Sequence, residues 1–175
     1  MKLGFMGEFR HSLDSKNRLI IPSRFRELLG EQFVVTRGLD RCLYICPMDE
    51  WFRLQESFPS TAIATSDYRK FSRLLNAGAV SGEFDTQGRV TIPANLLEYA
   101  GITRDLVVIG VGTRAEVWSV EAWDNYRDDA EGSFNDVVEK ILDRPRGAGY
   151  QAPSDQVPGS PVSATKTATE GEGVR

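Results

Sequence analysis

The sequence is poor in the residues that metal sites and nucleophilic sites use most often. Its 175 residues include two cysteines and one histidine. With His11 as the single imidazole, a zinc site of four Cys and His ligands is not favoured. Cys42 and Cys46 would lie about 13 Å apart along a strand, which is too far for a disulfide. We therefore predict no bound metal, and two half-buried strand cysteines in a reducing compartment.

Long hydrophobic runs are also lacking. The opening MKLGFMGEFRH is interrupted by charge too early for a signal peptide, and no stretch approaches the roughly 20 apolar residues of a membrane span. Apolar residues make up 41% and charged residues 26% of the chain, which is ordinary for a soluble globular protein. We predict a cytoplasmic protein of one or two domains.

Positive charge is scarce overall, since the formal net charge is −4. The distribution is uneven, however. Residues 1 to 26 carry six Lys and Arg against two carboxylates, a local balance of +4, whereas residues 116 to 143 carry nine carboxylates against two cations. A polyanion would therefore have to meet the protein at one face, built by the first residues of the chain.

An internal repeat organises the chain. LDSKNRLIIP at 13 to 22 and FDTQGRVTIP at 84 to 93 place their acid, arginine and proline at one offset of 71 residues. Each motif has the pattern of a strand, a tight turn and a second strand. Asp14 and Asp85 accept amide hydrogen bonds as Asx-turns do, and Asn17 and Gly88 are residue types that tolerate a left-handed backbone.

The prolines that close the two motifs favour the first position of a helix. Apolar residues recur at helical spacing in SRFRELLG and ANLLEYAG, and each run ends in a glycine of the kind that caps a helix. Two β-rich segments and another helix follow in each copy, around 51 to 58 and 122 to 129. A unit of about 45 residues is small for an independent core, so we expect the two copies to pack as one pseudo-symmetric body.

The remaining segments lie between and after the copies. SDYRKFSRLLNAG carries an apolar helical stripe, and FNDVVEKILD presents an apolar face that the body or a neighbouring subunit must cover. We predict a first repeat at 7–54, a linking helix at 55–81, a second repeat at 83–126, an amphipathic helix at 127–144 and a disordered tail at 145–175.

Enzymatic interpretations find weak support. Gly110, Gly112 and Ala115 have the spacing of a dinucleotide fingerprint, but a second strand candidate follows them instead of a helix, so a hairpin turn is favoured. The single histidine has no G-x-S-x-G serine to serve. Asp14 and Asp85 are each explained by a turn of their own. We predict no catalytic residues, no cofactor and no small-molecule substrate.

The arginines of the two motifs allow two interpretations. Arg18 and Arg89 could pair with the aspartates of their own turns, which is common and contributes little when exposed. Around Arg18, however, several cations can converge on one face: Lys16, Arg24 and Arg26, with Arg10 and His11 on the adjoining strand. A rigid turn that holds arginine and lysine outward suits phosphate contacts, or a bidentate bond to guanine in a groove. His11 is more readily explained as structural.

At these motifs the sequence resembles the MraZ family of bacterial transcriptional regulators, over about residues 1 to 144. GEFRHSLDSKNRLIIPSRFRELLG matches the opening motif of that family, and FDTQGRVTIPANLLEYAGI matches its second D-x-x-G-R motif. The resemblance implies an α+β, β-rich fold of two SpoVT-AbrB type swapped-hairpin repeats in one small barrel-like body with peripheral helices. It also implies assembly into a ring and DNA binding through the loops around the D-x-K-G-R motifs.

By this resemblance, Lys16 and Arg18 stand at DNA-contacting positions and Arg89 at the counterpart in the second copy. Asn17 replaces the usual glycine, and Gln87 replaces a basic residue. The first loop is therefore expected to contribute more to DNA recognition than the second. The predicted DNA-binding residues are Arg10, Lys16, Arg18, Arg24 and Arg89, and the predicted turn-structuring residues are Asp14, Asn17, Asp85 and Gly88.

The resulting functional hypothesis is a nucleoid-associated, homo-oligomeric regulator that binds double-stranded DNA. The resemblance implies short direct repeats at the promoter of the division and cell-wall gene cluster as the target. An alternative stays open: a structural or toxin-antitoxin-like interaction module of the same fold, in which the apolar face of residues 134 to 142 binds a protein.

Overall fold

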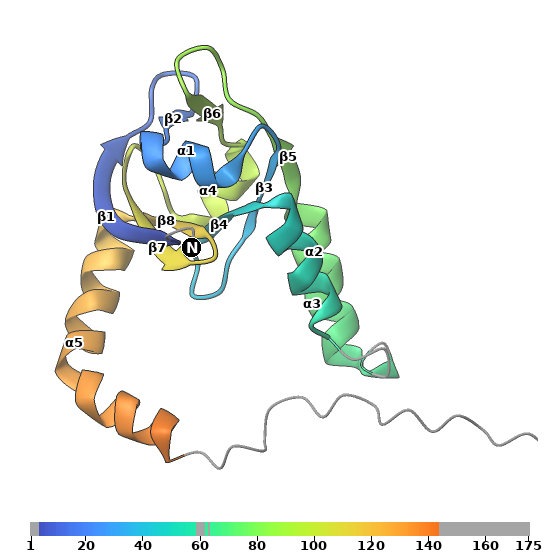
Figure 1. The fold of residues 1–175 in the computed structure, drawn as a ribbon, viewed down its shortest axis with the longest axis vertical. Coiled ribbons are helices and arrows are strands. Elements are labelled where there is room, and N and C mark those ends of the chain that lie inside the picture. The colour runs from blue at the N-terminus through green and yellow to red at the C-terminus, as the bar shows by residue number, and fades with distance from the viewer. Residues whose placement is uncertain (1–3, 59–61, 63, 144–175) are drawn as a thin grey trace, which may run out of the picture. The chain divides into compact units, whose positions relative to one another are not determined.

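The computed structural model describes residues 4–58, 62 and 64–143. Figure 1 shows their order along the chain. The strands are β1 (Phe5–Ser12), β2 (Arg18–Ile20), β3 (Phe33–Arg37), β4 (Leu43–Pro47), β5 (Val80–Gly82), β6 (Arg89–Thr91), β7 (Asp105–Gly112) and β8 (Ala115–Ser119). The helices are α1 (Ser23–Leu29), α2 (Met48–Glu56), α3 (Ser66–Gly78), α4 (Ala94–Ala100) and α5 (Val120–Leu142).

Six strands form one antiparallel sheet in the order β1-β7-β8-β4-β3-β5. This order is palindromic with respect to the repeat, since β1, β7 and β8 correspond to β5, β3 and β4. At its centre Tyr44 lies opposite Glu116, and the flanking pair Leu43–Val117 has its symmetry mate in Ile45–Ala115. The predicted pseudo-symmetric body is therefore confirmed, with its local twofold axis between β4 and β8.

The strands on either side of each turn do not pair with one another. Instead, β2 pairs with β6 of the other copy, with Leu19 opposite Val90 at the centre of this two-stranded ribbon. Two further backbone bonds join the copies: Ile21 donates to the carbonyl of Gly88 and Ile92 to that of Asn17. The copies thus exchange strands, which a local strand-turn-strand pattern cannot specify.

Helices α1 and α4 begin at the predicted places, but Pro22 and Pro93 occupy the N-cap and not the first helical position. They end at Gly30 and Gly101, both with positive φ. Their apolar side chains join the ribbon and the large sheet in one core. Its fully buried members include Leu19, Ile21, Phe25, Phe33, Val35, Leu43, Ile45, Val90, Ile92, Leu96, Leu106, Val108, Ala115 and Val117.

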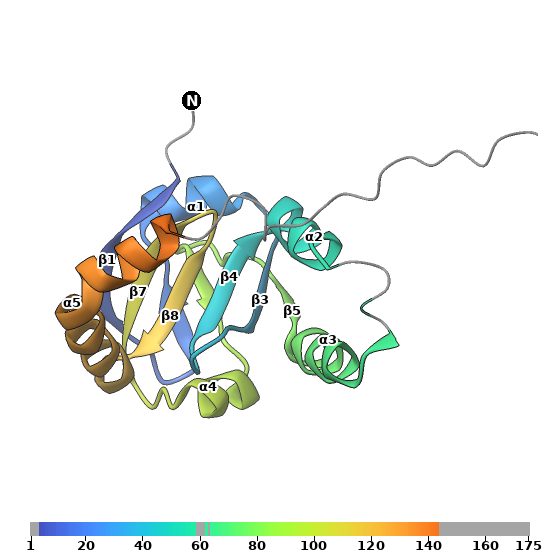
Figure 2. The same ribbon diagram turned by 90° about the horizontal axis from the view of Figure 1, so that it is seen from below.

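Helices α2 and α3 lie beside one another next to β3 and β5 (Figure 2). A second, smaller cluster joins them to β3 and β4 through Val34, Cys46, Trp51 and Leu75. The hydroxyl of Thr36 in β3 donates to the carbonyl of Leu75, which fixes α3 against the sheet edge.

Helix α5 is one continuous helix, whereas the sequence predicted two, one around 122 to 129 and an amphipathic helix at 127–144. Its first part packs on β8, where Trp118, Trp123 and Tyr126 stack at centroid distances of 5.1 to 6.1 Å. Residues up to Gly132 form one compact unit, and a second unit begins at Ser133. The predicted disordered tail at 145–175 lies outside the described residues.

Several smaller expectations concern single positions. Cys42 and Cys46 are free and fully buried, not half-buried as predicted, and Cys42 lies just before β4. Burial raises the pKa of the Cys46 thiol to about 12. Gly110 and Ala115 face one another in the β7–β8 hairpin, so the hairpin interpretation of VVIGVGTRA is confirmed. Within the described ranges, no helix has the length and hydropathy needed to cross a membrane. The same residues include no group of three or more His, Cys, Asp or Glu placed to hold a metal.

Candidate nucleic-acid interface

The first turn is built around the carboxylate of Asp14. Its Oδ1 accepts hydrogen bonds from the amides of Lys16 (2.8 Å) and Arg18 (3.0 Å), and its Oδ2 accepts from Arg18 Nε (2.7 Å). Asn17 occupies the left-handed region with φ 57° and donates its amide to the Asp14 carbonyl at 3.0 Å. The predicted Asx-type turn is therefore present and has a partner for each amide that it turns inward.

The second turn repeats this geometry with little change. Asp85 Oδ1 accepts from the amides of Gln87 and Arg89, both at 2.9 Å, and Oδ2 accepts from Arg89 Nε at 2.8 Å. Gly88 has φ 73° and donates to the Asp85 carbonyl at 2.9 Å. Because two copies with different intervening residues fold alike, the acid and the arginine determine the turn.

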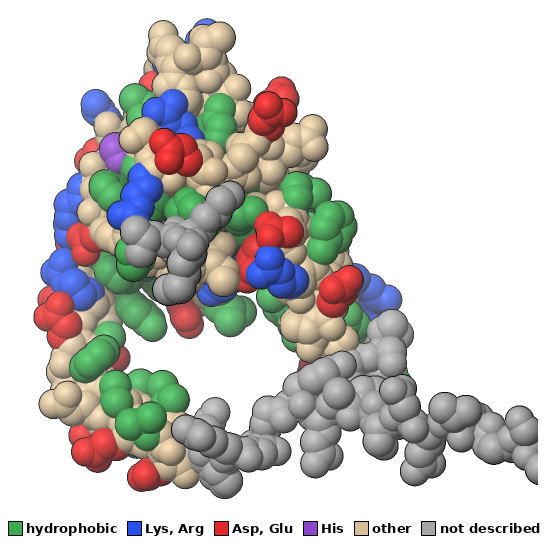
Figure 3. All heavy atoms as spheres, in the orientation of Figure 1, with side chains coloured by type: hydrophobic (Ala, Val, Ile, Leu, Met, Phe, Trp, Pro, Cys, Tyr) green, Lys and Arg blue, Asp and Glu red, His purple; other side chains and the backbone are tan. Residues whose placement is uncertain are grey.

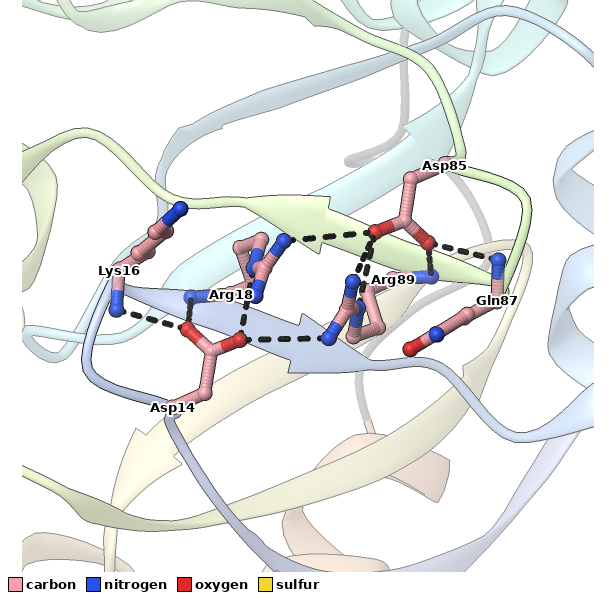
Figure 4. A network of polar contacts seen from close by, with 6 residues as sticks. All are labelled: Asp14, Lys16, Arg18, Asp85, Gln87 and Arg89. Atoms are coloured by element: carbon pink, nitrogen blue, oxygen red, sulfur yellow. Dashed lines mark hydrogen bonds and ion pairs between the residues drawn. The ribbon is translucent and has the colours of Figure 1, made fainter.

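The two turns are joined by charge across the ribbon (Figure 4). Arg89 Nη1 lies 3.5 Å from Asp14 Oδ2, and Arg18 Nη1 lies 3.9 Å from Asp85 Oδ2. The side chains of Arg18 and Arg89 are 27% and 19% exposed. Each guanidinium thus lies between two carboxylates, in a cluster of two cations and two anions. This is the paired arrangement considered for both arginines from the sequence, and it leaves the cluster without net charge.

The electrostatics of the cluster favour ionised carboxylates. For Asp85, the hydrogen bond from the Arg89 side chain, followed by amide bonds, lowers the pKa to about 2. For Asp14, desolvation opposes ionisation, but the amides of Arg18 and Lys16 together with the Arg18 guanidinium outweigh it and lower the pKa. Both turns therefore keep their charged partners at neutral pH.

Other cations near the first turn are free to meet an anion. Lys16 is exposed, its side chain extends away from the Asp14 carboxylate in Figure 4, and Gln87 takes its place in the second turn. Arg24 is exposed on the first turn of α1. Within the described part of the chain, no ion pair of Lys16 or Arg24 is found. The uncompensated positive charge of this end therefore comes from residues flanking the motif arginine.

Arg10 and His11 lie on the adjoining strand β1 and are less available. Arg10 pairs with Asp124 of α5 and lies 3.5 Å from Glu8, although 47% of its side chain is exposed. His11 is half-buried opposite Leu106, and burial lowers the pKa of its imidazole. Figure 3 shows blue basic and red acidic side chains interspersed along this side of the molecule.

One contact of the site was not predicted: Arg26, expected among the cations around the first turn, lies against the second turn instead. An added Cβ at Gly88 would lie 2.0 Å from Nη1 of Arg26, so the Arg26 guanidinium of α1 covers the turn of the second copy. The position equivalent to Arg26 in α4 is Leu97, which is buried in the core. The sequence difference between these two similar helices, Arg26 in α1 and Leu97 in α4, is the signal from which an added role of Arg26 could have been inferred.

Fold and site together define a class: β-rich proteins of two strand-exchanged repeats, each with an Asp–Arg turn at the shared ribbon. The family model described as "MraZ protein, putative antitoxin-like" matches the chain twice, at residues 5–74 and 75–145. The chain belongs to the MraZ family, and the predicted family membership and fold class are confirmed.

Curated relatives agree with this assignment. The chain is 52% identical over 139 residues to the "Transcriptional regulator MraZ" of Natranaerobius thermophilus, covering 79% of this chain and 97% of that protein. It is 49% identical over 139 residues to the protein of the same name in Desulforamulus reducens, covering 79% and 98%. A third relative of that name, in Carboxydothermus hydrogenoformans, is 47% identical over the same length, covering 79% of this chain and 97% of that protein.

Proposed function

We propose that this protein is a transcription regulator that binds double-stranded DNA sequence-specifically as a homo-oligomer. Its relatives carry the name of transcriptional regulators. The proposed target is a set of short direct repeats at the promoter of the division and cell-wall gene cluster, in the cytoplasm and at the nucleoid. Such a protein acts by binding and needs neither catalytic residues nor a cofactor.

The observation that carries the proposal is the first turn. Its backbone is held by the Asp14 carboxylate, and the uncompensated cations Lys16 and Arg24 flank it. A rigid loop with exposed cations loses little conformational freedom on binding and can contact phosphates in a fixed register. The chain as a whole is acidic, so this local charge would direct the approach of DNA.

The motif arginines would act in a different way from the free cations. Arg18 and Arg89 each form two ion pairs, and the 2.7 Å bond from Arg18 Nε to Asp14 leaves the two Nη atoms as the donors that a guanine could meet. We therefore propose that they contribute to DNA binding mainly by fixing the shape of both turns, while Lys16, Arg24 and the partly paired Arg10 meet phosphates. Base reading by Arg18 would use its two Nη atoms while Nε stays bonded to Asp14, and it would compete only with the 3.9 Å contact between Nη1 and Asp85.

Oligomerisation would supply the affinity. One small basic cluster on an acidic protein cannot hold DNA tightly at physiological salt. A ring of subunits would place several such loops against successive repeats, and tethering would raise the effective concentration for each later contact. A monomer that bound a single repeat as tightly as an array would contradict this mechanism.

The test is fluorescence anisotropy with a duplex carrying the repeats upstream of the protein's own operon, compared with a scrambled duplex. Lys16→Ala should weaken binding to the repeats, and the slope of log K against log salt should fall by about 1 for each loop engaged. Gln87→Ala is the matched control in the second turn and should change neither quantity. Equal affinity for both duplexes, or no effect of Lys16→Ala, would contradict the proposal.

A second candidate is a protein-interaction module of the same fold. The observation that favours it is the exposed apolar face on the last part of α5, where Phe134, Ile141 and Leu142 are 63 to 77% exposed. In that case the arginine turns would only hold the two repeats together. Retained DNA binding after these apolar residues are replaced would separate the two functions.

A further inference from the structure

A cavity of about 440 Å³ opens between the β3–β4 hairpin and the helices α2 and α3, away from the two turns. This volume is within the range of about 300 to 1,000 Å³ that is typical of binding pockets. Its walls are mainly apolar: Leu39, Leu54, Phe58, Phe71, Leu74 and Leu75. Leu39 and Leu74 are 61% and 57% exposed, so the cavity continues into an apolar surface.

Two arginines give this pocket a positive rim. Arg37 stacks over the ring of Tyr99 at 5.2 Å from its centroid, and Arg114 stacks over Tyr44 at 4.1 Å. Arg114 is compensated by Glu116, with Nη2 3.1 Å from Oε1. Arg37 has no ion pair within the described ranges, and the Nε atoms of both arginines are buried without a hydrogen-bond partner. The pocket therefore suits an apolar ligand that carries carboxylates at its edge.

The same chain carries a segment with that chemistry. The last turns of α5 expose Phe134, Val137, Val138, Ile141 and Leu142, which we call the distal α5 face. Figure 3 shows hydrophobic side chains gathered on this part of the helix. Asp136, Glu139 and Asp143 lie among them against the single cation Lys140, so the segment is apolar on one face and net negative.

We propose that the pocket of one subunit receives the distal α5 face of a second copy of this chain. Apolar residues at i, i+3, i+4 and i+7 are the anchors by which an amphipathic helix occupies a groove. The acidic residues beside them complement the unpaired Arg37 at the rim. Because the pocket and the helix are different surfaces, the contact is head-to-tail, and such contacts close into rings when the rotation between subunits allows.

This inference deepens the homo-oligomer of the proposed function and rests on it. Two substitutions at exposed positions remove one side of the contact each: Leu74→Asp in the pocket and Ile141→Asp on the helix. Matched controls on the same helices, outside the pocket lining and the apolar face, are Ala77→Asp and Asn135→Asp. Circular dichroism melts of the full-length variants check that all of them fold.

Analytical ultracentrifugation then measures the mass of each species. The wild type and both controls should assemble, whereas Leu74→Asp and Ile141→Asp should each sediment as monomers. A 1:1 mixture of these two variants keeps one intact pocket and one intact helix per pair, so it should give dimers and nothing larger. Arg37→Glu should weaken wild-type assembly by about tenfold or more.

Each other outcome overturns the inference. A monomeric wild type would mean that the helix binds in its own chain or binds another protein. If Leu74→Asp or Ile141→Asp alone kept the wild-type mass, or if their mixture stayed monomeric, the interface would lie elsewhere. Affinity for a DNA duplex with one repeat is measured separately and should be unchanged in both variants. If the wild type binds neither that duplex nor an array of repeats, the proposal of DNA binding fails. The masses from ultracentrifugation still show whether the pocket and the distal α5 face form the interface.

Discussion

The two Asp–Arg turns at the ribbon have almost the same hydrogen bonds, yet they differ in sequence at the three positions between the acid and the arginine and in what covers them. The first turn has Ser15, Lys16 and Asn17, and the second has Thr86, Gln87 and Gly88. Arg26 covers the second turn, whereas its counterpart Leu97 points into the core. One scaffold therefore supports two tasks: the first turn carries free charge at the surface, and the second is closed over by a side chain from the other repeat.

The difference between the turns also affects which residues each turn can accept at its left-handed position. At Gly88 the φ is positive and an added side chain would displace the Arg26 guanidinium, so glycine is favoured on both counts. At position 17 only the backbone conformation is demanding, and asparagine adopts it. Substitutions can test this contrast, beginning with the ribbon that the two turns share.

The largest loss is expected at the centre of the ribbon, where Leu19 faces Val90. Leu19→Ala should lower the free energy of unfolding by about 2 to 5 kcal/mol, since the side chain is fully buried and its loss leaves a cavity. Val90→Ala should cost less because it removes fewer carbon atoms. Urea unfolding followed by circular dichroism measures both, with the exposed Thr91→Ala as control. A loss below about 1 kcal/mol for Leu19→Ala would show that the ribbon is not part of the cooperative core.

The next effect is loss of stability in acid. The folded pKa values of Asp14 and Asp85 lie below the ordinary value of 3.8, that of Asp85 at about 2. Their stabilising contribution is therefore complete above about pH 4 and declines as the pH falls toward 2. Thermal melts between pH 5 and 2 should show a weaker pH dependence for Asp14→Asn and Asp85→Asn than for the wild type. An unchanged profile in both variants would contradict the proposed charge cluster.

A smaller and asymmetric effect is expected when the two left-handed residues are exchanged. Gly88→Asn should lower the free energy of unfolding by about 1 to 2 kcal/mol, since the backbone is left-handed and Arg26 must move. Asn17→Gly should change it by at most about 1 kcal/mol in either direction. Chemical denaturation measures both, and equal losses would mean that Arg26 does not distinguish the turns.

The smallest effect is expected on DNA binding by the second turn. Gln87→Lys gives the second turn the positive charge of the first. If the second turn lies near DNA, the affinity for the duplex should rise several-fold at low salt. The slope of log K against log salt should steepen by about 0.9 for each loop that gains a phosphate contact. Gln87→Glu, measured by the same anisotropy assay, should weaken binding. No change in either variant would place the second turn away from the DNA.

Much of the local structure followed from the sequence. The repeat offset, the helices after Pro22 and Pro93 and the aspartate-centred turns are short-range features, and Asp14 and Asp85 bond amides only two and four residues away. The continuous α5 was not foreseen, because its two amphipathic stretches face different surroundings. The cover of Gly88 by Arg26 was not foreseen either, because it joins residues of different repeats.

The sequence by itself determined that two copies of one unit exist, where each turn lies and which residues shape it, since these depend on backbone preference and neighbouring side chains. Only the tertiary structure decided that β2 pairs with β6 and that Arg18 and Arg89 each share two carboxylates. The physical reason is that hydrogen bonds and ion pairs between distant segments depend on how the core brings them together. That same exchange compensates the charge of the motif arginines and leaves the flanking cations to meet an anion.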